Sequence, residues 1–578
     1  MNRRFPLLAL AAAIPALGFS QTAIDAMRFS QPDLRGTARF MSMGGAFGAL
    51  GGDLSSLSQN PAGIGVYRSS DIGFTLNLDA QSAKASTPGS ATTLNQTKFY
   101  LNNIGGVFAI KLPSATVPNI DVGFTYNKTT SFNRRYAGSF PTLSNSMSNY
   151  IAGITNNGGN AFNEGDLTAT DGYNPYNPTD GGIVAPWLSI LGYEGFLITP
   201  EYEAADVDRK NPRWFGQWGN GTSGSGRFNV EERGCVDSYN IALGGNFGNI
   251  VYWGMDFDIT HLDYSITSSW GENLKDAYVE GDQGIENIPA DWTIGSNYSA
   301  SGTGFNYKLG VIVKPIQELR LGFAFHTPTY YSLSQTYSAG LGYAYNGGNT
   351  KYIDANKGID GYNDMNFRTP WRFIASAATV LFNKLIISAD YEWSGYRNMQ
   401  FSTPNYGYYD YGYDWDYGWD NPWDYPYYYA PATRANAVDN PYNDGTGFGV
   451  TNHDIRDYMQ HTNTLRLGAE YRVTPGLSVR AGYSFVSSPI NSKTRNNKTN
   501  VYPSGDIVPS FRLDNTTNYV TLGVGYKVKW FYADLAYVYK HQSSTFHAYP
   551  QDITNPDSPQ ADLDFSQNQV VLTMGVRF

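Results

Sequence analysis

The sequence predicts an all-β protein: a transmembrane β-barrel of about 14 antiparallel strands whose lumen is plugged by a short helical segment near the N-terminus. Three observations indicate this fold class. Polar and apolar residues alternate with a period of two in many segments of about ten residues. The connections between these segments are short and long in turn. Aromatic residues make up 15% of the chain, yet no apolar run is long enough for a membrane-spanning helix, which excludes a helical bundle.

The first 20 residues have the pattern of a secretory signal peptide. Arg3 and Arg4 give a positive start, residues 5–17 form an apolar run, and small residues precede a cleavage position ahead of Gln21. We therefore assign residues 1–20 to a signal peptide and expect the mature chain to leave the cytoplasm.

Composition excludes several classes of function. Cys235 is the only cysteine, so the chain can form neither an intramolecular disulfide nor a cysteine-based metal site. The formal net charge of −10 argues against a nucleic-acid partner. The six histidines are scattered and lack the HxH or HExxH spacing of a metal site. We expect no metal, no cofactor and no catalysis; capture of heme is a minor alternative.

The last ten residues, QVVLTMGVRF, show the alternation most clearly. One face of this segment is wholly apolar: Val570, Leu572, Met574, Val576 and Phe578. The other face includes Gln569, Thr573 and Arg577. Charged residues would be costly in the core of a soluble sheet, but they are solvated in a water-filled lumen. The pattern therefore favours strands that turn apolar residues to lipid and polar residues inward.

Fourteen segments of this kind follow one another along the chain. They lie near residues 71–80, 99–112, 120–131, 236–247, 251–263, 304–314, 318–328, 371–381, 385–394, 464–473, 477–487, 517–528, 531–541 and 568–578. An even number of strands places both barrel termini on one side of the membrane, which we expect to be the periplasmic side.

The connections support the same arrangement. Those after even-numbered strands are short, and those after odd-numbered strands run from about 18 to about 100 residues, as in bacterial outer-membrane barrels. We expect the barrel to span residues 71–578, with long extracellular loops at 132–235, 264–303, 329–370 and 395–463.

Residues 21–70 do not fit the strand pattern and are the expected plug. Four apolar residues have the i, i+3, i+4, i+7 spacing of two helical turns: Met43, Ala46, Phe47 and Leu50. Asp53 is a candidate N-cap for a second short helix. Asn60 ends it, because the following Pro61 disfavours a helical conformation at the preceding residue. The segment has a suitable size to fill a lumen that 14 strands leave open.

One stretch resembles a known family. The run GTARFMSMGGAFGALGGDLSSLSQNPAGI, residues 36–64, is similar to the N-terminal hatch of FadL-type outer-membrane transporters for hydrophobic compounds. The closest matches are Arg39, Ser42, Gly45, Ala46 and the signature Asn60-Pro61-Ala62. The motif covers about 30 residues, and the remaining likeness is architectural. The outer loops are longer than is usual in the family, so its ligand-contacting loop residues cannot be transferred.

The resemblance implies a passive bacterial outer-membrane transporter. A long-chain fatty acid or similar molecule would be captured outside, held in an apolar pocket, and released when the hatch rearranges, either into the periplasm or sideways into the bilayer. Keeping such a ligand out of water is worth roughly 0.8 kcal/mol per CH₂ group. Fatty acids are the favoured ligand class, and the surrounding outer-membrane lipid is the other expected partner.

The hatch supplies the candidate gating residues. Asn60, Pro61 and Ala62 are the expected gating element, with Gly44, Gly45, Phe47 and Arg39 as hinge, packing and matched motif positions. An equally open interpretation makes the Asn-Pro-Ala turn a structural anchor and the glycines close-packing positions.

A second candidate site is an aromatic loop. Its rings alternate with glycine and aspartate, so an extended backbone places them on one side as a ligand-capture surface: Tyr411, Tyr413, Trp415, Tyr417 and Trp419. The alternative is a low-complexity surface loop that packs on itself.

Two further functions stay open. The connection 132–235 is long enough for a folded cap or a partner surface, so the chain could be an adaptor barrel that docks secreted or surface proteins. His541 and Ser543 face lipid, and Asn568 lies opposite His541 if Phe531 pairs with Phe578, an arrangement similar to that of outer-membrane phospholipases.

Overall fold

The computed structural model describes residues 22–156, 161–177, 185–203, 206, 211–281, 284–404, 446–496, 507–550 and 558–578. The expected signal peptide and the aromatic residues at positions 411–419 lie outside these ranges. No helix of the described part is long and apolar enough to cross a membrane.

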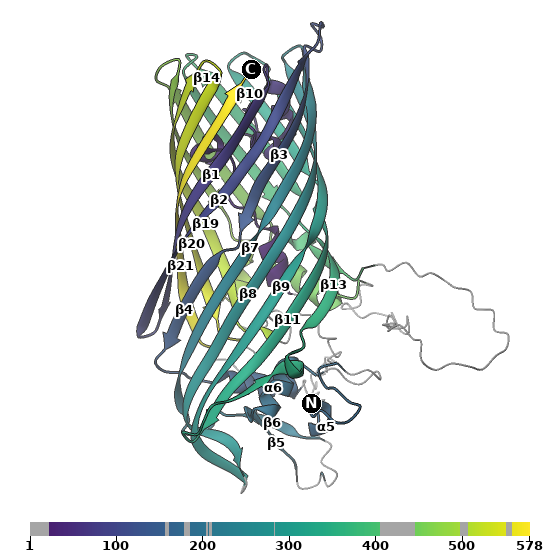
Figure 1. Cartoon of the computed structure of the whole chain (residues 1–578), viewed down its shortest axis with the longest axis vertical. Helices are drawn as coiled ribbons and strands as arrows, with labels where there is room; N and C mark the ends of the chain where they lie inside the picture. The colour runs from purple at the N-terminus through teal and green to yellow at the C-terminus, as the bar shows by residue number, and fades with distance from the viewer. Residues whose placement is uncertain are drawn as a thin grey trace, which may run out of the picture.

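The predicted fold class is confirmed: 14 antiparallel strands form a closed barrel (Figure 1). Each expected strand has a counterpart in the wall. The wall strands are β1 (Asp71–Thr87), β2 (Ser90–Lys111), β3 (Asn119–Ser131), β7 (Ser223–Phe247), β8 (Val251–Gly281), β9 (Gly284–Val313), β10 (Leu319–His326), β14 (Arg372–Leu381), β15 (Leu385–Ser394), β17 (Thr462–Arg472), β18 (Leu477–Val486), β19 (Phe511–Val528), β20 (Phe531–His547) and β21 (Gln560–Arg577).

The barrel closes where the first and last strands pair, with Asp71 opposite Arg577 and Ser86 opposite Asp562. The connections that the sequence predicted to be short lie at the end that contains Asp71 and Arg577, at the top of Figure 1. We call this the turn end. The opposite end, which contains the long connections and also the tight turn at residues 88–89 between β1 and β2, is the cap end.

The two faces of the wall have the predicted character. Val570 on β21 points outward and is 46% exposed, whereas the neighbouring Gln569 points into the lumen and is 2% exposed. Gln569 accepts a hydrogen bond from Asn77 of β1 at 2.8 Å, so lumen-facing polar groups are satisfied across strands. Apolar residues face lipid and polar residues line the lumen, as a membrane barrel requires.

Several strands are much longer than the ten residues needed to cross a membrane. β8 and β9 have 31 and 30 residues, so most of the connection expected at 264–303 is strand rather than loop. The connection at 329–370 likewise contains β11 (Tyr330–Tyr345), β12 (Lys351–Asp354) and β13 (Gly361–Arg368). On these extensions the polarity is reversed: Trp270 is buried inside, and Thr267 lies exposed outside.

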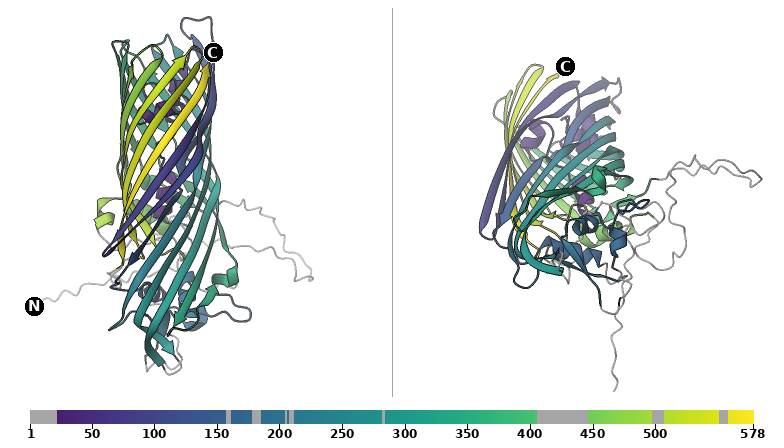
Figure 2. Two further views of the ribbon diagram at one scale, coloured as in Figure 1. Left: turned by 60° about the vertical axis from the view of Figure 1, so that its left-hand side comes forward. Right: turned by 60° about the horizontal axis from the view of Figure 1, so that its bottom comes forward.

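A folded cap lies at the end of these extensions (Figures 1 and 2). It is formed by part of the connection 132–235. Its elements are α4 (Met147–Thr155), α5 (Glu164–Leu167), α6 (Trp187–Glu194), β5 (Ile198–Glu201) and β6 (Arg213–Gly216), whereas β4 (Arg134–Phe140) of the same connection pairs with β7 in the wall. Their apolar side chains join one buried cluster with the inner faces of the long strands, which holds the cap in place.

Smaller elements complete the connections at the cap end. They are η3 (Ala355–Gly358), η4 (Tyr396–Asn398), β16 (Gln400–Ser402), α7 (Gly449–Tyr458) and α8 (Ser492–Asn496).

The segment before the first strand consists of α1 (Ala23–Ser30), α2 (Ala38–Ser42), α3 (Ser56–Gln59) and the 3₁₀ helix η1 (Pro61–Val66). The helix predicted over residues 43–50 is wrong. This stretch forms turns, because Gly44 and Gly45 adopt φ values of 63° and 77°, which interrupt a right-handed helix. The second predicted helix is present as α3 and ends at Asn60 as expected, but its N-cap is Ser55 rather than Asp53.

Candidate functional site

The N-terminal segment runs through the lumen from the cap end toward the turn end. α1 is buried in the cap-end core, where Phe29 packs edge-on against Tyr264 and Phe367. Residues 31–35 follow and line the lumen. α2, α3 and η1 then fill the lumen on the turn-end side, as the darkest ribbon inside the barrel in Figure 1 shows. We call residues 36–66 the plug.

Asn60 organises the part of the plug that carries the Asn-Pro-Ala motif. Its side-chain oxygen accepts a hydrogen bond from the backbone N–H of Ala62 at 3.1 Å and so caps η1. Its side-chain nitrogen donates to the carbonyl of Gly48 at 2.6 Å. Pro61 occupies the first position of η1. A backbone N–H at this position would have no acceptor within the helix, so proline loses no hydrogen bond there. The motif therefore joins the two halves of the plug.

The motif also presses against the barrel wall. Gly254 of β8 and Gly310 of β9 are cross-strand partners beside it. A Cβ atom on Gly254 would lie 2.1 Å from the carbonyl oxygen of Pro61, and one on Gly310 would lie 1.9 Å from the side-chain oxygen of Asn60. Only glycine permits such a close approach of the strands to the motif. These contacts support the interpretation of the Asn-Pro-Ala turn as a structural anchor of the plug.

Of the other hatch residues, Gly44 brings the plug against the opposite wall, and Phe47 packs within the plug. Gly44 has a left-handed conformation, and a Cβ atom there would lie 2.8 Å from the backbone oxygen of Tyr483 on β18. Phe47 is fully buried and packs on Phe40 with ring centroids 5.5 Å apart. Arg39 lies over the Phe47 ring, 5.3 Å from its centroid.

Arg39 also connects the plug to the wall through charge. Its Nε lies 3.0 Å from a carboxylate oxygen of Glu470 on β17. Glu470 in turn accepts from Arg480 of β18 at 2.6 Å, and Arg480 contacts Asp534 of β20 at 2.5 Å. A chain of buried ion pairs thus runs from the plug across the wall strands.

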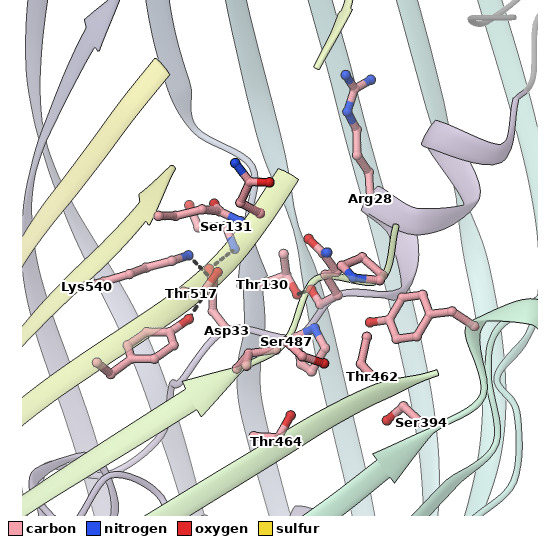
Figure 3. Close-up of a pocket in the computed structure, with 18 of the residues that line it drawn as sticks. Arg28, Asp33, Thr130, Ser131, Ser394, Thr462, Thr464, Ser487, Thr517 and Lys540 are labelled. Atoms are coloured by element: carbon pink, nitrogen blue, oxygen red, sulfur yellow. Dashed lines mark hydrogen bonds and ion pairs between the residues drawn. The ribbon is translucent and has the colours of Figure 1, made fainter. Parts of the chain in front are cut away.

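The lumen between plug and cap contains two adjoining cavities of about 180 and 70 Å³. Both are lined by residues 31–33 of the N-terminal segment and by wall residues such as Thr130 and Thr464. We treat them together as the lumen cavity. Figure 3 shows that Thr462, Thr464 and Ser394 reach it from wall strands, while Asp33 enters it from the N-terminal segment.

The lumen cavity is charged rather than apolar. Asp33 contacts Lys540 of β20 at 2.5 Å, and Arg35 at 3.6 Å. Burial alone would raise the pKa of the Asp33 carboxyl, but Lys540 and Arg35 outweigh burial and hold that pKa well below its usual range. Further buried ion pairs around the cavity are Arg466–Glu392, Arg28–Glu232, Arg512–Glu232 and Arg512–Asp514.

These cavity residues were missed by the sequence reasoning. Asp33 and Arg35 precede the family motif by only a few positions and are charges within a segment expected to fill a lumen. Lys540 occupies an inward position of its strand by the alternation rule. An enumeration of inward-facing charges would therefore have identified all three.

The wall has a stretch without continuous strand pairing. β2 pairs with β1 from Ser90 to Val107, but its ladder with β3 ends at Asn103 opposite Asn127. β3 ends at Ser131, and β4 continues the chain by pairing with β7 instead. Residues 90–102 of β2 therefore have no ladder partner on that side within the described chain.

A third cavity, of about 20 Å³, lies beside this stretch, and we call it the wall cavity. β1 contributes Ala83 and β2 contributes Leu94, while Arg134 reaches it from β4. Arg134, Lys540 and Gln542 line both the wall cavity and the lumen cavity. These three side chains form the partition between them.

The phospholipase arrangement is wrong, because the register of the last hairpin differs from the expected one. Phe531 pairs with Val576 rather than Phe578. Asn568 therefore lies opposite Tyr539, two residues from His541.

The remaining polar groups of this region have other partners. His541 contacts Asp564 at 2.6 Å, and Ser543 accepts from Asn515 at 3.5 Å. Within the described ranges, no three side chains of His, Cys, Asp or Glu are grouped to hold a metal ion.

The architecture is similar to that of several solved outer-membrane proteins. A FadL homologue from Pseudomonas aeruginosa shares 11% identity, with a TM-score of 0.47 and coverage of 95% of this chain and 99% of that one. The toluene transporter TodX of P. putida shares 12% identity, with a TM-score of 0.46 and coverage of 94% and 99%. The toluene transporter TbuX of Ralstonia pickettii shares 13% identity, with a TM-score of 0.41 and coverage of 94% of this chain and 99% of that one.

A comparison with curated protein sequences finds no match. A family model described as outer membrane protein transport protein (OMPP1/FadL/TodX) matches residues 262–578, more than half of the 578 residues. This match is independent of the N-terminal motif and confirms the resemblance that the motif suggested. The family consists of transport proteins rather than enzymes. The chain belongs to the OMPP1/FadL/TodX family of outer-membrane transport proteins.

Proposed function

We propose that the protein takes up hydrophobic small molecules, with long-chain fatty acids as the favoured class, and that residues 21–70 act as the hatch that gates their passage. In this proposal the cap end faces the outside and both barrel termini face the periplasm. The family match supports transport across the outer membrane. The toluene transporters among the similar structures make monoaromatic hydrocarbons the nearest alternative ligands.

The observation that carries the gating proposal is the path of one continuous segment. Residues 31–33 line the lumen cavity, and α2 of the plug begins at Ala38. A ligand in the cavity would therefore contact residues 31–33, and the same segment continues directly into α2, which blocks the lumen. Displacement of residues 31–33 by a ligand would act directly on the plug.

The size of the lumen cavity supports a gated mechanism. Its two parts, of about 180 and 70 Å³, are smaller than the roughly 300–1,000 Å³ of ordinary ligand pockets. A long-chain ligand fits only if the N-terminal segment or the cap moves. The charged lining favours an amphiphile, whose polar end can replace hydrogen bonds of the cavity, over a purely apolar molecule.

The unpaired stretch of β2 supports release sideways into the bilayer. The plug contacts wall glycines on both sides of the barrel and blocks the axial route. The wall cavity lies beside residues 90–102, where β2 has no ladder partner on the side of β3. The turn-end part of this stretch carries Phe99 and Leu101, whose side chains face outward and are 66% and 40% exposed. An apolar chain that leaves beside them would enter lipid without crossing water and so would retain its transfer free energy.

A disulfide between plug and wall tests the gating. A Cβ atom on Gly48 would lie 3.0 Å from the Cβ of Ser376 on β14, close to the roughly 3.5–4.5 Å of a disulfide. We would combine Gly48→Cys and Ser376→Cys with Cys235→Ser and measure uptake of oleate, toluene and hemin into proteoliposomes.

Oxidation of this double variant should reduce uptake of the transported ligand several-fold, and reduction should restore it. The single-cysteine variants under the same oxidant are the matched controls. Unchanged uptake in a fully cross-linked sample would contradict gating by the plug, and no uptake or binding of any of the three compounds by the wild type would contradict the proposed ligand class.

A second candidate function is the docking of a protein partner at the cap end. It rests on three large side chains grouped near β12 and β13: Tyr352, Ile359 and Tyr362 are 80%, 64% and 62% exposed. Such a patch is typical of an interaction surface. Loss of a co-purifying partner from a Tyr352→Ser, Tyr362→Ser variant would support this function, and its retention would argue against it.

A further inference from the structure

Three long strands, β8, β9 and β11, continue past the lipid-facing band as one sheet. Outward-facing side chains mark the edge of that band. Phe305 of β9 lies beside Tyr330 of β11, with ring centroids 5.9 Å apart, and Ile259 of β8 lies opposite Phe305. Aromatic girdles of this kind mark the membrane–water interface of outer-membrane barrels. Beyond this row the three strands run side by side toward the cap (Figure 1).

The outward face of these strands beyond the girdle consists mostly of hydroxyl groups. The next four outward positions on each strand are the alternate residues of 261–267, 297–303 and 332–338, and all twelve are exposed or half-buried. Nine of the twelve are Ser or Thr, and Asp263 is the one acidic residue beside no Lys or Arg. We call these twelve positions the hydroxyl face.

The hydroxyl face differs from an ordinary solvated surface. Such a surface carries charged residues at about a quarter to a third of its positions. The extension of the neighbouring strand β7 has this character, because Arg227, Glu231 and Arg233 point outward there with side chains 52%, 31% and 66% exposed. The short, mostly uncharged side chains of the hydroxyl face therefore need another explanation than solubility.

The hydroxyls are arranged in rows across the strands. Ser265, Ser299 and Thr336 are cross-strand partners and form one row. The hydroxyls of Ser299 and Thr336 lie 2.7 Å apart, and in the next row Thr267 donates to the side-chain oxygen of Asn297 at 3.0 Å. These contacts orient the side chains, and each hydroxyl oxygen still has lone pairs for a partner.

An exposed aromatic ring ends the same row. Tyr362 of β13 lies opposite Thr336 and is 62% exposed. Its hydroxyl donates to Asp364 at 2.6 Å, and Ser334 donates to the same carboxylate oxygen at 2.6 Å. A flat array of hydroxyls beside an aromatic ring suits a molecule that has both hydroxyl edges and apolar C–H faces, as a sugar ring does.

We propose that the hydroxyl face binds the saccharide of a glycolipid in the membrane leaflet that surrounds the cap end. The inference rests on the proposed function for its orientation, in which the cap end faces the outside. The face is continuous with the lipid-contacting wall, since it begins one row beyond Phe305 and Ile259. A lipid whose acyl chains pack on the wall below that row carries its head group at the level of the hydroxyls.

The dimensions and charge of the face fit this partner. Its four rows extend about 20 Å along the strands, enough for several linked sugar rings rather than a single small head group. Saccharide hydroxyls donate and accept hydrogen bonds, as Ser and Thr do, so each can pair without a counter-charge. A purely anionic head group would instead favour Lys and Arg, which are absent from the twelve positions.

The test compares two glycolipids that share an acyl anchor. Native mass spectrometry of the detergent-solubilised full chain would measure the affinity for lipopolysaccharide that carries its core oligosaccharide, and for lipid A, which lacks the core. The wild type should bind the first at least tenfold more tightly. Ser299→Ala combined with Thr336→Val should weaken binding of the lipopolysaccharide by about tenfold, because two hydroxyl partners are lost, and should leave binding of lipid A unchanged.

The matched control makes the same two changes away from the hydroxyl face. It combines Ser86→Ala and Thr93→Val, at outward positions of β1 and β2, and should keep the full preference. Ser265→Ala with Ser301→Ala is the second variant if the first pair does not fold, because neither hydroxyl bonds another described residue.

Three results would overturn the proposal. One is equal affinity of the wild type for the two glycolipids. Another is an equal effect of the control and of the hydroxyl-face variant, or a parallel loss of both lipids, which would place the contact on the lipid instead of the saccharide. The third is binding of the free core oligosaccharide as tightly as the whole glycolipid, which would remove the assignment to a membrane lipid.

Failure of the transport function has a different result. Binding in detergent does not require uptake, and the hydroxyl-face variant should take up ligand into proteoliposomes as the wild type does. A wild type that prefers the lipopolysaccharide but takes up none of oleate, toluene and hemin contradicts only the transport function. One that takes up a ligand but does not distinguish the two glycolipids contradicts only the saccharide site.

Discussion

The side-chain oxygen of Asn60 occupies the space that a Cβ atom on Gly310 would need, at 1.9 Å from its ideal position. The same oxygen caps η1 through Ala62, so one atom both shapes the plug and fits it to the wall. The family motif in the plug and a glycine 250 residues later in the chain therefore form one contact.

Replacement of that glycine should displace the plug. Gly310→Ala would place its methyl group against Asn60 and 2.9 Å from the Ala62 nitrogen. Overpacking of this kind costs about 1–3 kcal/mol, and we expect the plug to move rather than the strand. The variant should therefore show a raised ion conductance in planar bilayers.

Gly295→Ala is the control on the same strand, since nothing lies within 4 Å of the added methyl group. It should conduct as the wild type does. Equal conductance of the two variants would show that the contact of Asn60 with Gly310 does not hold the plug.

Asn60→Asp tests which of the two Asn60 hydrogen bonds matters. The substitution keeps an acceptor for Ala62 but removes the donor to the Gly48 carbonyl, 2.6 Å away. A buried carboxylate that faces a carbonyl is disfavoured by about 1–3 kcal/mol or more, and its pKa would be raised. At neutral pH, hydrogen exchange of residues 53–66 should be faster than in the wild type at the same pH, and this difference should shrink as the pH falls and the carboxyl becomes a donor. A difference from the wild type that does not change with pH would contradict this role of the donor.

The sequence pattern predicted the strands well because lipid and lumen impose opposite polarity on alternate residues. The same pattern could not determine how strands pair. A shift of two residues keeps every side chain on its face, and the expected pairing of Phe531 with Phe578 differs from the observed pairing with Val576 by two. Register depends on turn geometry and on packing in the lumen, which alternation does not encode.

The extensions of the long strands beyond the membrane could not be recognised in the sequence, for a physical reason. Beyond the membrane the outside faces water, so Thr267 and Ser269 point outward while Ile266 and Trp270 are buried. A search for apolar-out, polar-in strands rejects such a segment. The prediction of a helix at residues 43–50 was wrong for another reason. The apolar residues of this stretch do pack against the wall, but they are positioned by turns at glycine residues and do not share one face of a helix.

The ion pair between Arg39 and Glu470 should contribute to plug retention. Arg39→Met removes a contact at 3.0 Å but leaves Glu470 paired with Arg480 at 2.6 Å, so the Glu470 carboxylate keeps an ion-pair partner. We expect the free energy of local plug opening, measured by hydrogen exchange of residues 38–52, to fall by about 1.5–3 kcal/mol.

Arg233→Met is the corresponding control, because Arg233 is an exposed residue of β7 that pairs with Glu231 on the same strand. It should leave exchange of the plug unchanged. If Arg39→Met behaves like this control, the buried ion pair gives the plug no net stability, as happens when desolvation cancels attraction.

Ala83→Phe tests whether ligands leave sideways. Ala83 is buried, lines the wall cavity and lies opposite Leu94 of β2 in the ladder. A phenyl ring there would fill a cavity of about 20 Å³ at a cost of about 1–3 kcal/mol, which a closed barrel can sustain. We expect uptake into proteoliposomes to fall several-fold while ligand binding in the lumen persists.

Ala80→Phe on the same strand is the control, because its side chain points to lipid, and this variant should transport normally. Undiminished uptake by a folded Ala83→Phe variant would place the exit at the turn end instead, because the plug would then be the only barrier that a ligand still has to pass.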